Sequence, residues 1–146
     1  MLHFAYGIMF TIPMISIRGA QQKNPKKADN NRQYLIENGK RPGVTTTASG
    51  LQYRVLREGS GAQAAPLAEV EGDYRGKLIG GTIFDSSYDS GESISFLLGQ
   101  VIAGWQEGIP LMKVGAQYEF TIPFDLAYGK QGIAGVIPPY ATLIFE

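Results

Sequence analysis

From Val44 onward the chain consists of short segments in which apolar and polar residues alternate, separated by glycine-rich turns. The clearest segment is 117–122, QYEFTI, whose alternation places every second side chain on the same face of a strand. The dipeptide Gly80-Gly81 between two such segments is typical of a hairpin turn. This period of two predicts a β-rich domain with tight turns.

The same pattern divides this part of the chain into about six strands and one short helix. Ile102, Trp105 and Ile109 recur at helical spacing, so residues 101–111 are predicted to form the helix. Strands with one short helix predict an α+β fold class, in which the helix covers one face of a sheet. The predicted strands are residues 50–55, 70–79, 82–85, 94–98, 117–122 and 141–146.

Composition excludes several classes of function. Lys plus Arg equals Asp plus Glu at 13 each, and this balance argues against nucleic-acid binding, which depends on excess basic charge. The chain has no cysteine, so thiolate catalysis, cysteine-based zinc sites and disulfides are excluded. The single histidine, His3, stands near the N-terminus, which argues against histidine acid–base chemistry in the folded domain.

The N-terminal part of the chain is less regular. Residues 1–17 are apolar but contain Pro13, so they are too short and too interrupted for a transmembrane helix. They also lack the basic start of a signal peptide, which leaves two interpretations, an export-signal remnant or an unstructured tail. Residues 21–31 are polar, basic and interrupted by a proline, as in a linker.

A short helix is predicted between this linker and the strands. Residues 31–39, NRQYLIENG, favour about two helical turns, with Gly39 at the end. The predicted organisation is therefore an N-terminal segment and linker at 1–30, a helix stub at 31–43 and one folded domain at 44–146.

Five short motifs in a fixed order carry a family resemblance. Together they resemble the FKBP-type peptidyl-prolyl cis–trans isomerases, over residues 44–146. The lead-in TTTASGLQYRVLREGSG at 45–61 is similar to the bacterial Mip/FkpA branch of that family. The motifs are YRG at 74–76, FDSS at 84–87, VIAGW at 101–105, AYG at 127–129, and IPP at 137–139 followed by ATLIF at 141–145.

The resemblance implies an antiparallel sheet of about five to six strands wrapped around one short helix. It also implies catalysed rotation about Xaa–Pro bonds, without a cofactor or metal. Such rotation faces a barrier of about 20 kcal/mol because the amide has partial double-bond character. No covalent bond is made or broken, so a dry aromatic pocket that favours the twisted amide suits this chemistry.

The resemblance also implies a set of site residues. Trp105 corresponds to the floor under the proline ring, and the backbone N–H of Ile102 to a donor for the bound peptide. Val136 and Ile137 correspond to a loop that overhangs the site. The implied catalytic residues are Asp85, Trp105, Tyr128 and Phe145, and the implied substrate-binding residues are Tyr74, Phe84, Ile94, Val101, Ile102, Val136 and Ile137.

Simpler structural roles compete with these assignments. Without the motifs, a lone tryptophan on a short helix is more often a core residue. Asp85 is also suited to cap the turn that follows it, and Tyr128 to anchor its loop. Phe96 and Phe120 are interpreted as ordinary core aromatics. The glycine-rich loop at 127–139 lacks the lysine and the following helix of a phosphate-binding loop.

The sequence departs from the family pattern at several positions. Ile94 stands where many members have an aromatic wall residue, and Ile133 where some relatives have a loop histidine. We expect the final strand to be cut short at Glu146, and the N-terminal helices of the Mip/FkpA branch to be reduced to the stub. An interrupted final strand would leave neighbouring backbone groups unpaired.

The expected partners are unfolded or partly folded polypeptides that contain proline, and FKBP-directed macrolides are the expected inhibitors. A homodimer is expected only where the branch's N-terminal helices are present. The resemblance places the protein in the bacterial periplasm or at the outer-membrane face, with the cytoplasm as the other location. The alternative function is a proline-binding chaperone or binding module without significant turnover.

Overall fold

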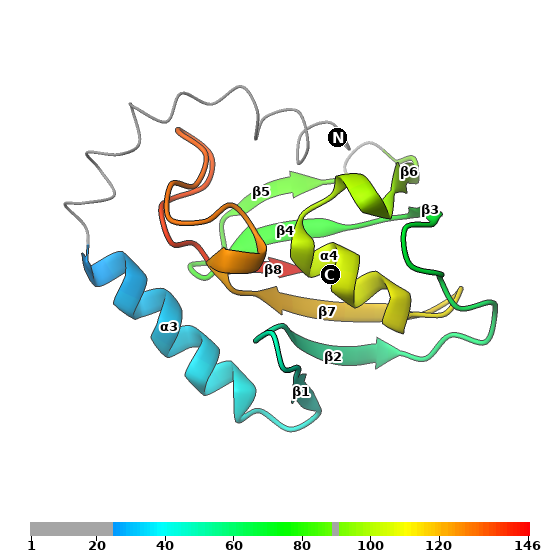
Figure 1. Cartoon of the computed structure of the whole chain (residues 1–146), viewed down its shortest axis with the longest axis horizontal. Helices are drawn as coiled ribbons and strands as arrows, with labels where there is room; N and C mark the ends of the chain where they lie inside the picture. The colour runs from blue at the N-terminus through cyan, green and yellow to red at the C-terminus, as the bar shows by residue number, and fades with distance from the viewer. Residues whose placement is uncertain (1–24, 89–90) are drawn as a thin grey trace.

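The computed structural model describes residues 25–88 and 91–146. Their largest sheet has six antiparallel strands in the order β1-β2-β7-β8-β4-β5, and two further strands pair as β3-β6. The short helix α4 crosses one face of the larger sheet (Figure 1). The strands are β1 (Val44–Thr46), β2 (Gln52–Arg57), β3 (Glu69–Gly72), β4 (Arg75–Leu78), β5 (Ile83–Ser86), β6 (Ile94–Leu97), β7 (Gln117–Ile122) and β8 (Leu143–Phe145). The helices are α3 (Pro25–Gly39) and α4 (Ala103–Gly108), with short 3-10 helices η2 (Leu98–Gln100), η3 (Ile109–Leu111) and η4 (Phe124–Leu126).

The elements confirm the predicted α+β class and the short helix. The alternating segment 117–122 forms β7 over the predicted residues. Gly81 adopts a φ of 95° in the turn that joins β4 to β5, a conformation that favours glycine. The hairpin signal therefore led to the correct strand pair, β4 antiparallel to β5.

The single strand predicted at residues 70–79 is wrong. Two strands occupy it, β3 paired with β6 in one sheet and β4 paired with β5 and β8 in the other. Side-chain hydrogen bonds stabilise the segment between β3 and β4. The Ser87 hydroxyl accepts from the Tyr74 N–H at 2.8 Å. The Asp73 carboxylate accepts from the hydroxyls of Ser87 and Ser93, both at 3.2 Å. These bonds direct the chain from one sheet to the other.

The predicted start of the first helix is also wrong. The helix was expected at residue 31 after a linker, but α3 begins at Pro25. Proline suits the first helical position because its missing N–H is not needed there. A 3.0 Å ion pair between Arg32 and Asp29 supports the following turn. The predicted N-terminal segment at residues 1–24 lies outside the described residues.

Helix α3 is attached to the sheet through buried amide groups. The Asn38 side-chain amide donates to Gln52 Oε1 at 2.8 Å and to Thr121 Oγ1 at 3.2 Å. Near the middle of the helix, Asn31 Oδ1 accepts from the backbone N–H of Thr142 at 2.7 Å. The helix therefore contacts β2, β7 and the segment that leads into β8.

Helix α4 packs closely against β7, and this contact places Trp105 in the core. A Cβ atom at Gly104 would lie 2.6 Å from Ile122, so only glycine allows this approach. The core between helix and sheet is apolar, and Leu51, Ile122 and Leu143 are fully buried in it. Burial of this kind is the main favourable contribution to folding.

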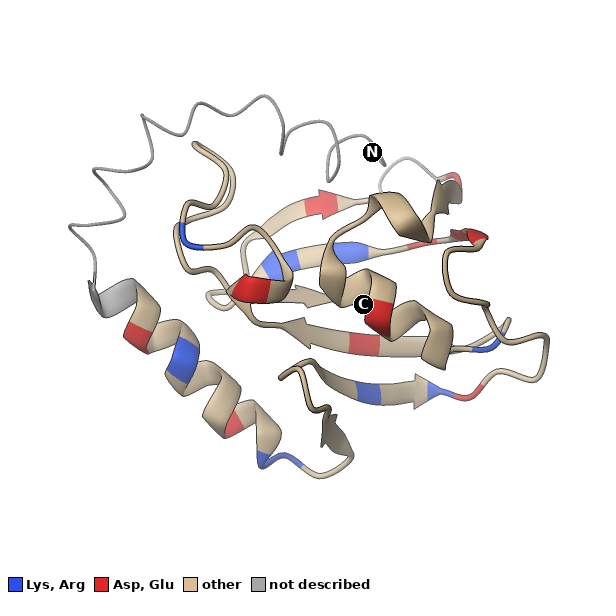
Figure 2. Cartoon of the chain, viewed as in Figure 1, with Lys and Arg blue, Asp and Glu red and all other residues tan. Residues whose placement is uncertain are grey.

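Charged side chains are distributed without a dominant sign. Lys, Arg, Asp and Glu are interspersed over α3 and the strands in the view of Figure 2. In the part of the chain that the structure describes, neither helix combines the length and the apolar character needed to cross a membrane.

Candidate active site

The candidate site is built around Trp105, which α4 holds against the sheet. The side chain is 5% exposed, and three aromatic rings pack around it. The ring centroids of Tyr74 and Phe145 each lie 5.0 Å away in edge-on geometry, and that of Phe96 lies 5.1 Å away. Such edge-on pairs are favourable because a positive ring edge meets a negative ring face. Three separate segments of the chain therefore converge on the indole of a fourth.

Phe84 extends the aromatic cluster on the β5 side. Its ring meets Phe145 edge-on at 5.5 Å, and the two rings meet above Gly76 of β4. A Cβ atom at Gly76 would lie 2.6 Å from the Phe145 ring and 2.7 Å from the Phe84 ring. Glycine in the YRG motif is therefore needed to make room for both aromatic walls.

A buried hydrogen bond joins the next two predicted residues. The Tyr74 hydroxyl donates to Asp85 Oδ2 at 2.7 Å, and both residues are buried. Burial raises the pKa of the Asp85 carboxyl above its ordinary value, although the bonds from Tyr74 and from the Ser86 backbone act to lower this pKa. Burial and the bond to Asp85 raise the pKa of Tyr74 well above its ordinary value. A neutral phenol therefore donates to a carboxyl group whose ionisation is made unfavourable by burial.

Tyr128 follows η4 in the long glycine-containing loop. Burial, and secondarily the charge of Asp85, raise the pKa of Tyr128 well above its ordinary value. The electrostatic effect of Asp85 indicates that this phenol lies close enough to respond to the same carboxylate. The charge of Asp85 therefore acts to raise the pKa of both phenols, Tyr74 and Tyr128.

The overhanging loop is closed on itself. The Ile133 N–H donates to the Ile137 carbonyl at 2.7 Å, and the Ile137 N–H donates back to Ile133 at 2.8 Å. Ile137 and Ile133 are each 2% exposed, whereas Val136 is half-buried against the core. The position compared with a loop histidine therefore holds a buried aliphatic side chain.

Val101 and Ile102 lead directly into α4. Both are buried, and the Ile102 carbonyl accepts the N–H groups of Trp105 and Gln106 at 3.0 and 3.1 Å. The Gln106 side-chain amide donates to the Val101 carbonyl at 2.8 Å. Ile94 of β6 packs against the same core cluster. All eleven predicted site residues thus belong to this cluster or are bonded to it, Asp85 being joined through Tyr74.

The prediction that Phe96 is a core aromatic is confirmed, since its side chain is buried in the core cluster. What the sequence did not indicate is that its ring lies directly beside Trp105. Ile94 and Phe96 are two residues apart on β6, so they share one face of the strand. This spacing was the available signal, because it extends the aliphatic wall at Ile94 into an aromatic one.

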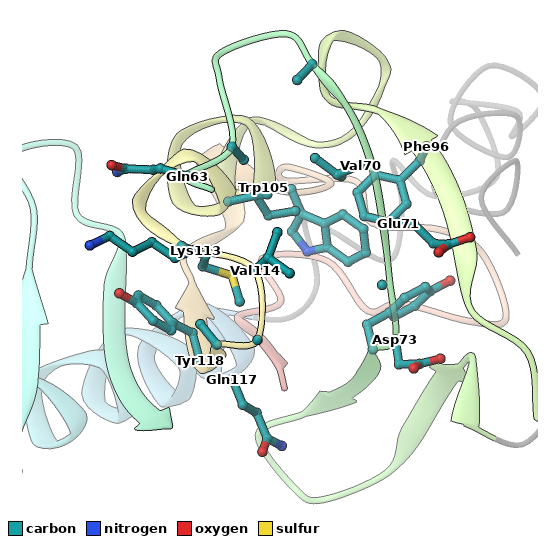
Figure 3. Close-up of a pocket in the computed structure, with 18 of the residues that line it drawn as sticks. Gln63, Val70, Glu71, Asp73, Phe96, Trp105, Lys113, Val114, Gln117 and Tyr118 are labelled. Atoms are coloured by element: carbon teal, nitrogen blue, oxygen red, sulfur yellow. The ribbon is translucent and has the colours of Figure 1, made fainter. Parts of the chain in front are cut away.

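A groove of about 920 Å³ lies beside Trp105. Its walls come from β3, β6, β7 and the segments around η3, and Figure 3 shows Trp105 and Phe96 among its lining side chains. Of the predicted residues, Tyr74, Trp105 and Phe145 line it, whereas Asp85 and Tyr128 are not among its lining residues. We place the candidate active site at Asp85 and Tyr128, where the polar groups of the ring cluster lie.

Within residues 25–88 and 91–146, no three His, Cys, Asp or Glu side chains are grouped so as to hold a metal ion.

Comparison with protein families gives two matches. A family model described as FKBP-type peptidyl-prolyl cis-trans isomerase matches residues 61–146, and one described as the domain amino terminal to that isomerase matches residues 14–55. The FKBP-type 22 kDa peptidyl-prolyl cis-trans isomerase of Escherichia coli is 51% identical over 114 residues, covering 78% of this chain and 55% of the relative. The peptidyl-prolyl cis-trans isomerase Mip of Coxiella burnetii is 49% identical over 119 residues, covering 82% and 52%.

Further similarities agree with these matches. The outer membrane protein MIP of Legionella longbeachae is 41% identical over 125 residues, covering 83% of this chain and 54% of the relative. The crystal structure of FkpA from Escherichia coli superimposes with a TM-score of 0.83 at 38% identity, covering 88% of this chain and 60% of FkpA. The chain spans about half the length of the curated relatives it matches.

Proposed function

Because this chain belongs to the family of FKBP-type peptidyl-prolyl cis–trans isomerases, we propose that it accelerates rotation about Xaa–Pro bonds in polypeptides and so assists their folding. The observation that carries the proposal is the cluster of Tyr74, Phe84 and Phe145 around a buried Trp105, with the Asp85 carboxylate beside it. The proposed substrates are unfolded or partly folded chains that contain proline.

The proposed chemistry needs no nucleophile. Rotation breaks the conjugation of the amide, so the twisted state is less polar than the planar ground state and is favoured where water is excluded. Trp105 and the rings around it supply an apolar surface for the proline ring. An aromatic environment that favours the twisted amide over the planar one lowers the barrier, because only differential binding accelerates a reaction.

Polar groups at the edge of the ring cluster are proposed to hold the flanking peptide. The Tyr128 hydroxyl and the Ile102 backbone N–H are the proposed donors to peptide carbonyl groups. Asp85 is proposed to act on the twisted amide through its charge, with Tyr74 fixing the carboxylate in place. The remaining proposed contacts to substrate are with Phe84, Ile94, Val101, Val136, Ile137 and Phe145.

A protease-coupled assay on short peptides with leucine or phenylalanine before proline tests this function. We expect the soluble, folded protein to accelerate cis–trans conversion of both peptides. Tyr128→Phe should lower kcat/KM about tenfold, as expected for one lost hydrogen bond in the transition state. Tyr140→Phe is the matched control, because Tyr140 lies in the same part of the chain but packs on Phe124 at 5.1 Å.

The assay also separates the alternative function. Saturable binding of the proline peptide without acceleration would identify a proline-binding chaperone or binding module and would contradict the enzyme proposal. Equal activity in the Tyr128→Phe and Tyr140→Phe variants would remove Tyr128 from the proposed set of peptide donors.

Ligand binding gives a test that does not depend on turnover. A macrolide directed at FKBP pockets should raise the melting temperature, because a ligand that binds only the folded state stabilises it. The shift should decrease in Trp105→Leu, which removes the aromatic floor but keeps an apolar side chain. An unchanged melting temperature at saturating macrolide would show that this ring cluster does not form the expected pocket.

The proposed location is the bacterial envelope. One matched relative is named an outer membrane protein, and family similarity extends over residues 14–55. Fractionation of bacterial cells that produce the protein from its own gene tests this location. Recovery with the cytoplasmic marker alone would contradict it.

A further inference from the structure

Ser87 binds both backbone groups of Tyr74. The Ser87 N–H donates to the Tyr74 carbonyl at 2.8 Å, and the Ser87 hydroxyl accepts from the Tyr74 N–H at 2.8 Å. Two residues that form a hydrogen-bonded antiparallel pair normally exchange two backbone bonds. Here the side chain of Ser87 takes the place of its carbonyl, so the chain can turn away after β5 while Tyr74 remains held.

Tyr74 is held at its other end by a residue of the same strand. Its hydroxyl donates to Asp85 Oδ2 at 2.7 Å, and Asp85 stands in β5 two residues before Ser87. This spacing places both side chains on the side of the strand that faces Tyr74. The backbone and the phenol of Tyr74 are therefore bonded to two neighbouring side chains, and together these groups form a closed circuit of hydrogen bonds.

Water is largely excluded from this circuit. Ser87 is fully buried, and Tyr74 and Asp85 are 7% and 6% exposed. A buried polar group that loses its partner has little water to replace it, so each bond constrains its neighbours more strongly than it would at the surface. The position of the Asp85 carboxylate therefore depends on the backbone of Tyr74 as well as on its phenol.

Asp73 orients the hydroxyl that holds Tyr74. The Ser87 hydroxyl lies 3.2 Å from Asp73 Oδ1, whereas the Tyr74 carbonyl is the more distant acceptor at 3.4 Å. With its proton directed at Asp73, the hydroxyl presents a lone pair to the Tyr74 N–H. The other oxygen of the Asp73 carboxylate accepts from the Ser93 hydroxyl at 3.2 Å. Because Asp73 is exposed, a surface carboxylate sets the orientation of a buried hydroxyl.

The held tyrosine also belongs to the aromatic cluster. The centroid of its ring lies 5.0 Å from that of Trp105 and 6.1 Å from that of Phe145. Such ring contacts tolerate small shifts, whereas a hydrogen bond weakens steeply as its angle and distance depart from the optimum. The bond from the phenol to Asp85 is therefore the contact most sensitive to where the backbone of Tyr74 lies, and Ser87 fixes that backbone.

We propose that Ser87 is a positioning residue for proline isomerisation and that Asp73 orients its hydroxyl. Ser87 acts through the backbone of Tyr74, whose phenol keeps the Asp85 carboxylate aligned with the twisted amide. This inference rests on the function proposed above, in which Asp85 acts on the twisted amide through its charge. Losing an interaction that is made only in the transition state lowers kcat and leaves KM unchanged.

The test compares Ser87→Ala with Asn31→Ala, because each removes the side-chain acceptor of a buried backbone N–H. Asn31 accepts from the Thr142 N–H at 2.7 Å, a bond of similar length outside the ring cluster. In the protease-coupled assay, Ser87→Ala should lower kcat about tenfold without a change in KM, because displacement of a positioned group slows the reaction. Asn31→Ala should keep the wild-type kcat, although both variants should melt at a lower temperature than wild type.

A titration of Asp85 gives a second measurement, which needs no turnover. Burial raises the pKa of the Asp85 carboxyl, and the bond from Tyr74 acts to lower this pKa. A looser bond should therefore raise the pKa of Asp85, which carbon-13 NMR of its carboxyl group measures. Tyr74→Phe removes the bond and sets the upper limit of the rise. Ser87→Ala should raise the pKa part of the way to this limit, and Asn31→Ala should leave it unchanged.

Variants of the exposed Asp73 decide the question if Ser87→Ala does not fold. Asp73→Asn and Asp73→Ala remove the same charge, but only asparagine retains an oxygen that accepts from the Ser87 hydroxyl. The value of kcat should therefore fall in Asp73→Ala and stay near that of wild type in Asp73→Asn. Ser93→Ala removes the other hydroxyl bonded to Asp73 and should leave kcat unchanged.

Two results of the activity assay would overturn the proposal: equal losses of kcat in Ser87→Ala and Asn31→Ala, or equal losses in Asp73→Asn and Asp73→Ala. An unchanged pKa of Asp85 in Ser87→Ala would also overturn it. An inactive wild-type protein would instead contradict the proposed function, and the titration would then decide whether Ser87 positions Asp85.

Discussion

The bond between Tyr74 and Asp85 provides a quantitative test of the site's architecture. Tyr74→Phe removes one hydroxyl and keeps the ring that packs 5.0 Å from the centroid of Trp105. The change therefore leaves the aromatic cluster in place and takes one donor from a buried carboxylate. We expect the variant to fold with a lower free energy of unfolding.

The structure fixes the expected magnitude. Asp85 is 6% exposed and Tyr74 is 7% exposed, and their oxygens lie 2.7 Å apart, so water does not readily replace the lost phenol. Hydrogen bonds to charged groups contribute about 1.5–3 kcal/mol, and the Ser86 backbone bond to Asp85 remains. Tyr74→Phe should therefore cost about 2 kcal/mol at neutral pH.

The pH dependence follows from the raised pKa of Asp85. The ordinary value is 3.8, so as pH rises the unfolded chain releases this proton before the folded chain does. Ionisation then favours the unfolded state, and the stability contributed by Asp85 falls until the pH exceeds the folded pKa. Tyr74→Phe raises that folded pKa further. The substitution should lower the free energy of unfolding by about 1 kcal/mol at a pH below the ordinary pKa of 3.8, and by about 2 kcal/mol at neutral pH.

The assay is urea unfolding followed by Trp105 fluorescence, for wild type, Tyr74→Phe, Asp85→Asn and the double variant. The amide introduced by Asp85→Asn would still accept from Tyr74 but carries no charge. The stability of this variant relative to wild type should therefore be highest at neutral pH. The double-mutant cycle should give a coupling energy of about 1 kcal/mol or more. A coupling energy near zero, or a Tyr74→Phe cost that does not change with pH, would refute the argued bond.

Two further substitutions test the packing around the site. Gly76→Ala should lower stability by about 1–3 kcal/mol in thermal melts, because the added Cβ would clash with two aromatic rings. Gly80→Ala is the control, because its added Cβ would meet no atom within 4 Å. Equal melting temperatures of the two variants would contradict the described contact at Gly76. Asn31→Ala should cost about 1–2 kcal/mol in urea unfolding by leaving a buried backbone N–H without its acceptor. The exposed neighbour Asn30→Ala should cost far less, and an equal loss would indicate a general effect on the helix.

Local sequence patterns predicted an element correctly where the residues of that element themselves determine its structure. The alternation at 117–122 predicted the bounds of β7 correctly, although burial along this strand runs from a half-buried beginning to a buried end instead of alternating. The Gly80-Gly81 signal predicted the hairpin because a tight turn is decided by its own residues. The ring cluster was reached by resemblance, since composition and spacing alone do not bring Tyr74 and Phe145 to Trp105.

The errors arose where distant contacts decide the local structure. The break after Gly72 depends on Ser87 and Ser93, which bond to Asp73 from across the turn. The early start of α3 was missed because lysines, a proline and asparagines resemble a linker in composition, whereas in the structure Asn31 and Asn38 attach the helix to the sheet. Polar contacts of this kind leave little trace in a pattern based on hydrophobicity.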